Sequence, residues 1–298
     1  MIYTLGCSFA KWHWPTWADW LTVYKHPVTN WACPGYGNQL MYWLLVDRVE
    51  QITSQDHVMI MWSEPNRITQ WYEEDWVIEN DVAGFFPNDK KLWFSDGEDY
   101  TGLYRTHPDR KFSQIHNIVD TFKIIYDTQQ LLDGIGISYT MMFMTNPWID
   151  TRPNYIPNFT TNWDKKNQLS EVDNKKVQSI LNLSPIKKLL DRIDWGKFVG
   201  NPTIDSPESF AGLWQYYVER KELFSLAHET DFHPNILAHH DYLIEKILDQ
   251  ELSTSVHRPL AKKLTKDNIN MQLPAWQQKD FIGSVDNPLL DQKFKLLI

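Results

Sequence analysis

The sequence has only two cysteines, no long apolar run and no cluster of basic residues. Cys7 and Cys33 are too few for a disulfide framework or a cysteine-rich zinc site. No apolar run approaches the roughly 18 residues that mark a transmembrane helix, and the N-terminus lacks the basic and apolar regions of a secretion signal. The net charge of −9, with no clustered Lys or Arg, argues against a protein that follows nucleic-acid phosphates. We therefore expect a soluble protein with neither a membrane nor a nucleic-acid partner, kept in the cytoplasm or assembled from there into a larger particle.

What the chain has in abundance is apolar and aromatic residues. Hydrophobic residues make up 42% of it, and 15 Trp, 13 Tyr and 14 Phe supply large side chains for a core. Short apolar runs of strand length alternate with stretches whose apolar residues recur at helical spacing. We expect strands at 1–6, 57–62 and 136–144, and helices at 15–24, 40–52, about 112–133 and 236–250. This alternation predicts an α/β protein with a doubly wound, mostly parallel sheet.

Two polar stretches and the C-terminal end interrupt this pattern. Residues 1–250 are expected to form one domain with insertions at about 63–111 and 145–205. Within and after the second insertion, short helices are expected at 174–182, 185–194 and 206–226. Residues 251–298 are read as a C-terminal extension that wraps the domain or contacts a virion or oligomer partner.

Three polar clusters follow the expected strands directly. They are Gly6-Cys7-Ser8, Trp62-Ser63-Glu64 and Thr145-Asn146. In parallel sheets, sites gather outside the carboxyl ends of the strands. The three clusters are therefore expected to lie together at one edge of the sheet.

Ser8 and Cys7 are both candidate nucleophiles, and a nucleophilic serine needs a base that a third group orients. The loop "TDFHPN" supplies such a pair, because Asp231 and His233 stand two residues apart. The backbone N–H of Ser8 and a glycine of "CPGYGN" would serve as oxyanion donors. No residue near Cys7 is expected to lower the pKa of its thiol, so Cys7 and Cys33 are read as packing residues.

Four blocks, in the order that the chain presents them, carry a family resemblance. They read Gly6-Cys7-Ser8-Phe9, Asn30-Trp31-Ala32-Cys33-Pro34-Gly35-Tyr36-Gly37-Asn38, Trp62-Ser63-Glu64-Pro65-Asn66-Arg67 and Asp231-Phe232-His233-Pro234-Asn235. This set resembles the SGNH (GDSL) hydrolases, and most closely a variant often encoded by bacteriophages. The resemblance spans residues 1–250 and implies a three-layer α/β/α, flavodoxin-like fold.

The resemblance also implies roles for individual residues. Ser8 would be the nucleophile, His233 the general base and Asp231 the residue that orients it. Gly35 would donate to the oxyanion. The family places an Asn after its third strand as a second donor, whereas this chain has Ser63-Glu64 there and Asn66 two residues later.

Three further residues are candidates for substrate binding: Asn38, which closes the second block, Trp12 and Arg67. Trp12 follows the nucleophile turn and is suited to stacking on a sugar, as are Trp14, Trp71, Trp76 and Trp93. Arg67 would bind an anionic substrate group or pair with Glu64. Trp17 and Trp20 fit the core face of their helix and are expected to be buried.

Two functions are left open by these observations. The first is ester hydrolysis by a phage-encoded esterase or deacetylase that acts on acetylated glycans and needs no cofactor. The second is a weak or inactive derivative of such an enzyme that serves as a structural or receptor-binding part of a virion. A metal site in "HETDFHPNILAHH" is not expected, because the motif HExxH is absent and His239 and His240 would point to different helix faces, one packed and one solvated.

Overall fold

The centre of the molecule is a four-stranded parallel sheet. The structure, a computed structural model, describes residues 1–72 except 13, 25, 34, 35 and 66, and then residues 84–85, 92–96, 114–148, 174–220 and 233–271. The sheet comprises β1 (Ile2–Leu5), β2 (Val28–Asn30), β3 (His57–Trp62) and β7 (Ser138–Phe143) in the order β2-β1-β3-β7. All three pairings are parallel. This is the order of the first four strands in flavodoxin-like sheets.

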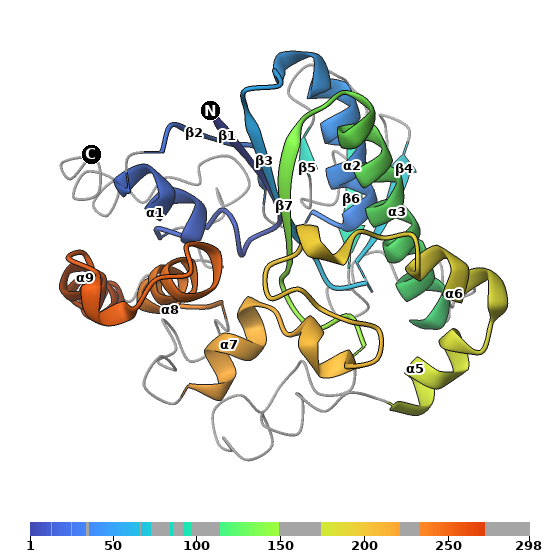
Figure 1. Cartoon of the computed structure of the whole chain (residues 1–298). Helices are drawn as coiled ribbons and strands as arrows, with labels where there is room; N and C mark the ends of the chain where they lie inside the picture. Colours follow the sequence, from blue (N-terminus) through green and yellow to red (C-terminus); the bar gives the residue numbers. More distant parts are fainter. Residues whose placement is uncertain are drawn as a thin grey trace.

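Helices cover both faces of this sheet and complete three layers (Figure 1). One face carries α2 (Asn38–Arg48), extended by a short 3-10 turn (Val49–Gln51), and α3 (Gln114–Gly134). The other face carries α1 (Trp17–Val23) and α8 (Ile236–Tyr242), which continues into a π-helical segment (Leu243–Ile247). The predicted three-layer α/β fold is therefore confirmed.

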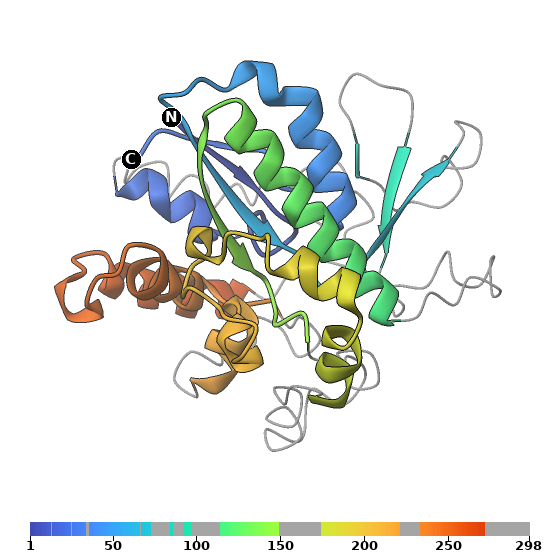
Figure 2. The same ribbon diagram turned by 45° about the vertical axis from the view of Figure 1, so that its right-hand side comes forward.

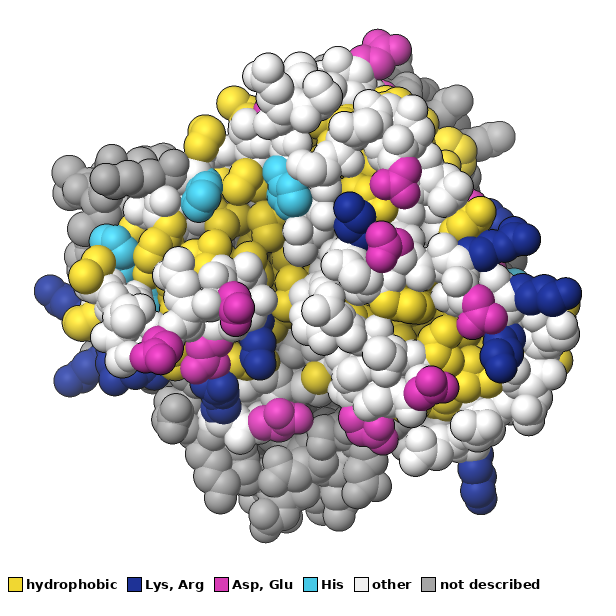
Figure 3. Space-filling model, viewed as in Figure 1, with side chains coloured by type: hydrophobic (Ala, Val, Ile, Leu, Met, Phe, Trp, Pro, Cys, Tyr) yellow, Lys and Arg dark blue, Asp and Glu magenta, His cyan; other side chains and the backbone are white. Residues whose placement is uncertain are grey.

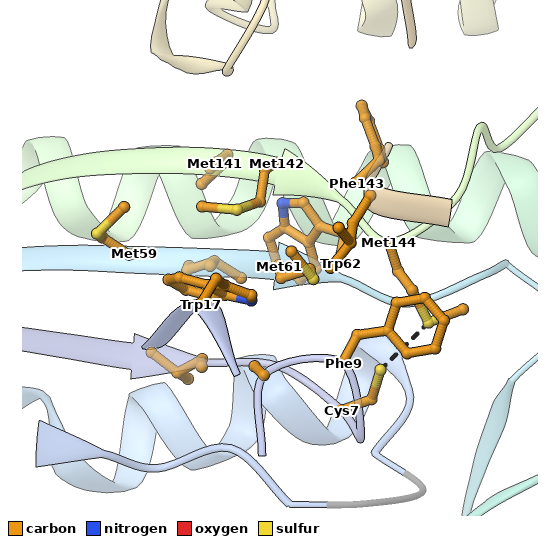
Figure 4. Packing of buried hydrophobic residues seen from close by; sticks show 14 of the residues in the cluster. Cys7, Phe9, Trp17, Met59, Met61, Trp62, Met141, Met142, Phe143 and Met144 are labelled. Atoms are coloured by element: carbon orange, nitrogen blue, oxygen red, sulfur yellow. Dashed lines mark hydrogen bonds between the residues drawn. The ribbon is translucent and has the colours of Figure 1, made fainter. Parts of the chain in front are cut away.

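Most strands of this sheet are largely apolar because helices cover both of its faces. Residues from Val58 to Trp62 in β3 are each at most 4% exposed, as expected for a strand that has helices above and below it. Methionine and aromatic side chains of β3 and β7 fill the centre of the core (Figure 4). Trp17 and Trp20 on α1 are fully buried, as predicted.

Polar caps fix where the two helices of one face begin. The N-cap of α1 is Thr16, whose backbone N–H donates to the Asp19 carboxylate (2.8 Å) in a capping box. The N-cap of α8 is Asn235, whose Oδ1 accepts a hydrogen bond from the Ala238 N–H (2.9 Å). Both caps lie close in sequence to predicted site residues, so they also fix the chain around the site.

The first inserted region holds a second, antiparallel sheet. Its strands are β4 (Ile68–Tyr72), β6 (Leu92–Asp96) and β5 (Gly84–Phe85), in the order β4-β6-β5. It lies beside α2, away from the main sheet (Figure 2). The sequence analysis gave this region no regular structure.

The second inserted region returns to the main sheet. It contains α5 (Asn174–Leu181), α6 (Ser184–Leu190) and two 3-10 turns (Trp195–Lys197 and Pro207–Phe210), and α7 (Leu213–Glu219) follows it. Phe198 forms a single parallel bridge with Met141 of β7, at the position of a fifth strand. The helix expected at 206–226 is therefore shorter in its described part, because a 3-10 turn and the break at Ala211-Gly212 precede α7.

The C-terminal region contributes a helix that the sequence analysis did not predict. After a short 3-10 turn (Leu252–Thr254), α9 (Arg258–Met271) packs along α8. Among the described residues, no helix combines the length and apolar character needed to cross a membrane. On the face seen in Figure 3, acidic and basic side chains are interspersed.

Candidate functional site

The chain turns sharply after β1, at Gly6-Cys7-Ser8. The carbonyl of Cys7 accepts hydrogen bonds from the backbone N–H groups of Ala10 (2.9 Å) and Lys11 (3.1 Å). A Cβ at Gly6 would lie 2.6 Å from the Cβ of Ala10, so only glycine fits there. Ser8 is 3% exposed, and neither its hydroxyl nor its N–H forms a hydrogen bond with a described residue. The turn thus presents a hydroxyl and a backbone donor that form no hydrogen bond with any residue the structure describes.

Asn30 holds this turn against the sheet. Its Nδ2 donates to the carbonyl of Ala10 (2.9 Å), and its Oδ1 accepts hydrogen bonds from Thr4 Oγ1 (2.9 Å) and the Ala32 N–H (3.0 Å). The first residue of the second sequence block therefore joins β1, β2 and the Ser8 turn. The sequence analysis gave Asn30 no role of its own.

The two cysteines lie in apolar surroundings. Cys7 is fully buried, and its Sγ lies 3.3 Å from the Sδ of Met144 at the end of β7 (Figure 4). Burial raises the pKa of the Cys33 thiol above its ordinary value, although Lys11 and a hydrogen bond with Tyr36 act in the opposite direction. Cys7 has no exposed surface, which favours Ser8 as the nucleophile of this turn.

His233 lies next to the Ser8 turn. Its ring stacks on the indole of Trp12, with centroids 3.7 Å apart and planes at 20°. The edge of the Phe9 ring meets it at a centroid distance of 5.5 Å. Because Phe9 follows Ser8 directly, this contact brings the histidine of the last block beside the serine of the first.

A hydrogen bond holds the two segments together. The indole Nε1 of Trp14 donates to the carbonyl of Pro234 (2.9 Å), although 220 residues separate them. Trp14 is 6% exposed and Trp12 is half-buried, so Trp14 has a structural contact where a sugar platform was expected. Asp231 lies outside the described residues, so its predicted contact with His233 stays a prediction.

Ser63 and Asn38 use their donors within the protein. The N–H of Ser63 donates to Asn38 Oδ1 (2.8 Å), and its hydroxyl donates to the carbonyl of Tyr36 (2.7 Å). Asn38 Nδ2 donates to the carbonyl of Ser63 and to Thr121 Oγ1 (both 3.1 Å). This exchange fixes the start of α2 at the end of β3. In this conformation Ser63 has no donor left for an oxyanion, and both amide protons of Asn38 are engaged away from a substrate.

The remaining predicted residues divide into two groups. Gly35 and Asn66, the other oxyanion candidates, lie outside the described residues, as does Trp76. Glu64 and Arg67 form an ion pair, with 3.6 Å between Arg67 Nε and Glu64 Oε1 and both side chains 7% exposed. Arg67 is therefore charge-compensated where it stands, in line with the ion-pair alternative.

The third polar cluster is structural as well. Gln215 on α7 accepts hydrogen bonds from the Asn146 and Gly212 N–H groups (both 3.0 Å) and donates to Thr145 Oγ1 (2.9 Å). A Cβ at Gly212 would lie 2.3 Å from the carbonyl oxygen of Phe143, so α7 approaches the end of β7 too closely for any side chain there. This cluster therefore positions α7 rather than a substrate.

The histidines of α8 differ from the sequence prediction. Both His239 and His240 are fully buried, so the expectation that one is solvated is wrong, because α1, α7 and α9 all pack against α8. Burial, and secondarily the nearby His233, lowers the pKa of His239 to about 3, while a backbone contact with Pro234 opposes the shift. His239 is therefore neutral at physiological pH. No group of three or more metal-ligating side chains occurs within the part of the chain that the structure describes.

The ring contacts thus join Phe9, Trp12 and His233. We call this cluster, together with Ser8, which directly precedes Phe9, the β1 site. Comparisons with protein-family models, curated proteins and solved structures find no match for this chain.

Proposed function

We propose that this protein is a serine ester hydrolase of the SGNH type, in which Ser8 is the nucleophile and His233 the general base. The observation that carries the proposal is the packing of His233 against Trp12 and Phe9, beside a buried serine whose hydroxyl has no hydrogen bond with a described residue. The resemblance of the four sequence blocks supports the same roles.

In the proposed reaction, Ser8 Oγ attacks the ester carbonyl carbon while its proton passes to a ring nitrogen of His233. The tetrahedral intermediate then collapses, the C–O bond to the alcohol breaks, and the imidazolium returns the proton to the leaving oxygen. Water releases the acyl group by the same route in reverse. Asp231 would hold the imidazole in the required tautomer.

The oxyanion needs at least two donors. The N–H of Ser8 has no hydrogen-bond partner among the described residues, which supports its assignment as one. Ser63 is engaged elsewhere, so Gly35 and Asn66 are the candidates for the others. We propose acetylated carbohydrate as the substrate class, with a sugar ring on the face of Trp12 that does not stack on His233.

The engagement of Ser63 and Asn38 favours a second candidate function. Loss of one oxyanion donor typically costs about 100- to 1,000-fold in rate. A chain that binds a glycan with a weakened site would suit a receptor-binding or structural part of a virion. This candidate predicts glycan binding without measurable acetate release.

Hydrolysis of p-nitrophenyl acetate separates the two functions. The esterase proposal predicts that Ser8→Ala and His233→Gln each lower kcat/KM by at least about 1,000-fold. The control variant Ser253→Ala, at an exposed serine whose hydroxyl donates to Glu251, should match the wild type. A folded wild-type protein that hydrolyses the ester no faster than buffer would contradict the esterase proposal.

A further inference from the structure

A second group of a serine, a histidine and a carboxylate lies between α1, α8 and α9. His240 Nδ1 is 2.8 Å from Asp241 Oδ1, and His240 Nε2 is 3.0 Å from Ser255 Oγ. The hydroxyl of Tyr24, at the end of α1, lies 2.7 Å from Ser255 Oγ and 3.1 Å from His240 Nε2. Arg258 at the start of α9 donates to both carboxylate oxygens of Asp241. We call these five residues the α8 array.

The order of these contacts is that of a serine-hydrolase triad. Asp241 is fully buried, and although burial opposes its charge, hydrogen bonds from His240 and Arg258 keep the pKa of this carboxyl below its ordinary value. An ionised Asp241 accepts a hydrogen bond from Nδ1–H of His240. The Nε2 lone pair then faces Ser255 and Tyr24, as a general base requires.

The hydroxyls of Tyr24 and Ser255 both lie within hydrogen-bond distance of His240 Nε2. Burial, and secondarily the charge of Asp241, raises the pKa of the Tyr24 phenol, against the effect of its hydrogen bond with Ser255, so Tyr24 stays protonated at neutral pH. Either hydroxyl can donate in the Tyr24–Ser255 pair, and in one arrangement the Tyr24 O–H donates to Ser255 Oγ. The Ser255 O–H is then left to donate to His240 Nε2.

The serine is more exposed than the two residues that would activate it. His240 and Asp241 are fully buried, Ser255 is half-buried, and the next residue, Val256, is 80% exposed. His239, one position earlier on α8, interacts with His233 instead. Because consecutive helix positions differ by about 100°, His239 does not share the direction in which His240 reaches Ser255.

We propose that Ser255 is a second nucleophile, activated by His240 and Asp241, that reacts with acyl and phosphonyl compounds bearing good leaving groups. With an aryl ester, Ser255 Oγ bonds to the carbonyl carbon and its proton passes to His240 Nε2. The bond to the aryl oxygen breaks, and the imidazolium gives its proton to the departing phenolate. With a fluorophosphonate, Oγ bonds to phosphorus, fluoride leaves, and the proton passes through His240 to water.

Peptide mapping after treatment with an alkyl fluorophosphonate tests this proposal on the full chain. Cleavage after lysine places Ser8 in residues 1–11 and Ser255 in residues 247–262, so the two nucleophiles report separately. We expect an adduct on Ser255 in the wild type and in Ser8→Ala. The peptide also holds Ser253, so the adduct should persist in Ser253→Ala and vanish in Ser255→Ala.

Two variants test whether Ser255 reacts because His240 and Asp241 activate it or only because the reagent can reach it. A general base contributes about 100- to 10,000-fold, so His240→Gln should slow adduct formation on Ser255 by at least about 100-fold. Asp241→Asn should slow it as well, because an amide does not hold the imidazole in the same tautomer. Circular dichroism checks that each variant is folded.

Two results would overturn the proposal: a folded wild-type protein without an adduct on Ser255, or an adduct that forms equally fast in both variants. Neither result bears on Ser8, whose adduct lies in another peptide. Conversely, failure to label Ser8 would leave the Ser255 result standing.

Discussion

The β1 site and the α8 array contain the same kinds of residue in different states. In the β1 site, Ser8 is a serine with no hydrogen bond to a described residue, and His233 is held by stacking on Trp12. In the α8 array, every polar group is joined to the next by a hydrogen bond of 3.1 Å or less. The first arrangement leaves groups available for a substrate, whereas the second also fastens α8 to α1 and α9.

This difference shows that a sequence motif and a hydrogen-bonded arrangement of side chains are independent signs of a functional site. The blocks around Ser8 and His233 are visible in the sequence, but their alignment depends on aromatic packing. The α8 array has no recognisable sequence motif, yet hydrogen bonds join all five of its residues. We expect substitutions in the α8 array to affect stability strongly, and those in the β1 site to affect mainly catalysis.

The largest expected effect on stability is that of Asp241→Ala. It would leave Arg258 and His240 without the carboxylate between them, and breaking a buried pair in this way typically costs about 3–5 kcal/mol. Urea unfolding measures the loss. Asp191→Ala, at an exposed helix end, is the control and should change stability by less than about 0.5 kcal/mol. Equal effects of the two would contradict the structural importance of the α8 array.

The next effect concerns His239, on the side of α8 that faces the β1 site. Its folded pKa of about 3 lies below the ordinary value of 6.5, so protons bind more readily to the unfolded chain as the pH falls below 6.5. The stability of the wild type should therefore fall relative to that of His239→Leu, by up to about 1.4 kcal/mol per pH unit between pH 6 and 4.5. Parallel pH profiles for the two proteins would show that His239 does not titrate in this way.

A smaller effect is expected from Gly6→Ala in the β1 site. The new Cβ would lie 2.6 Å from Ala10, and overpacking of this kind costs about 1–3 kcal/mol. Gly134→Ala, at the end of α3 with nothing within 4 Å, is the matched control and should be neutral or stabilising. Thermal unfolding compares them, and a neutral Gly6→Ala would mean that the turn is less constrained than its geometry indicates.

The smallest effect is expected from Trp12→Leu. An aromatic face against an imidazolium contributes about 0.5–1 kcal/mol, so kcat for ester hydrolysis should fall roughly 2- to 5-fold. Trp43→Leu, at a 39% exposed tryptophan on α2, should leave kcat unchanged. If Trp12→Leu alters KM alone, Trp12 contacts the substrate rather than supporting His233.

Much of the fold follows from local patterns in the sequence. The apolar run at 57–62 coincides with β3, and the run at 136–144 contains β7, because strands buried on both faces need no polar alternation. The short edge strand β2 was missed, since its three residues, Val28–Asn30, are only half-buried and carry no apolar run. The helix α9 was missed because its long polar face obscured the residues that pack on α8.

The candidate site was only partly predictable. The sequence indicated Ser8 and His233, and the structure brings their segments together. It could not reveal that Ser63 and Asn38 satisfy each other, since that exchange depends on the end of β3 meeting the start of α2. The α8 array was hidden for the same reason: its members come from the end of α1, from α8, from the turn before α9 and from α9 itself, and Asp241 beside His240 looks like an ordinary helix pair.

The central claim is that His233 activates Ser8, and the rate of fluorophosphonate addition to Ser8 tests it most directly. We predict a stoichiometric adduct in the peptide of residues 1–11 of the wild type, formed at least about 100-fold more slowly in His233→Gln. An unmodified Ser8 in the folded wild type, or equal rates in both proteins, would contradict the account.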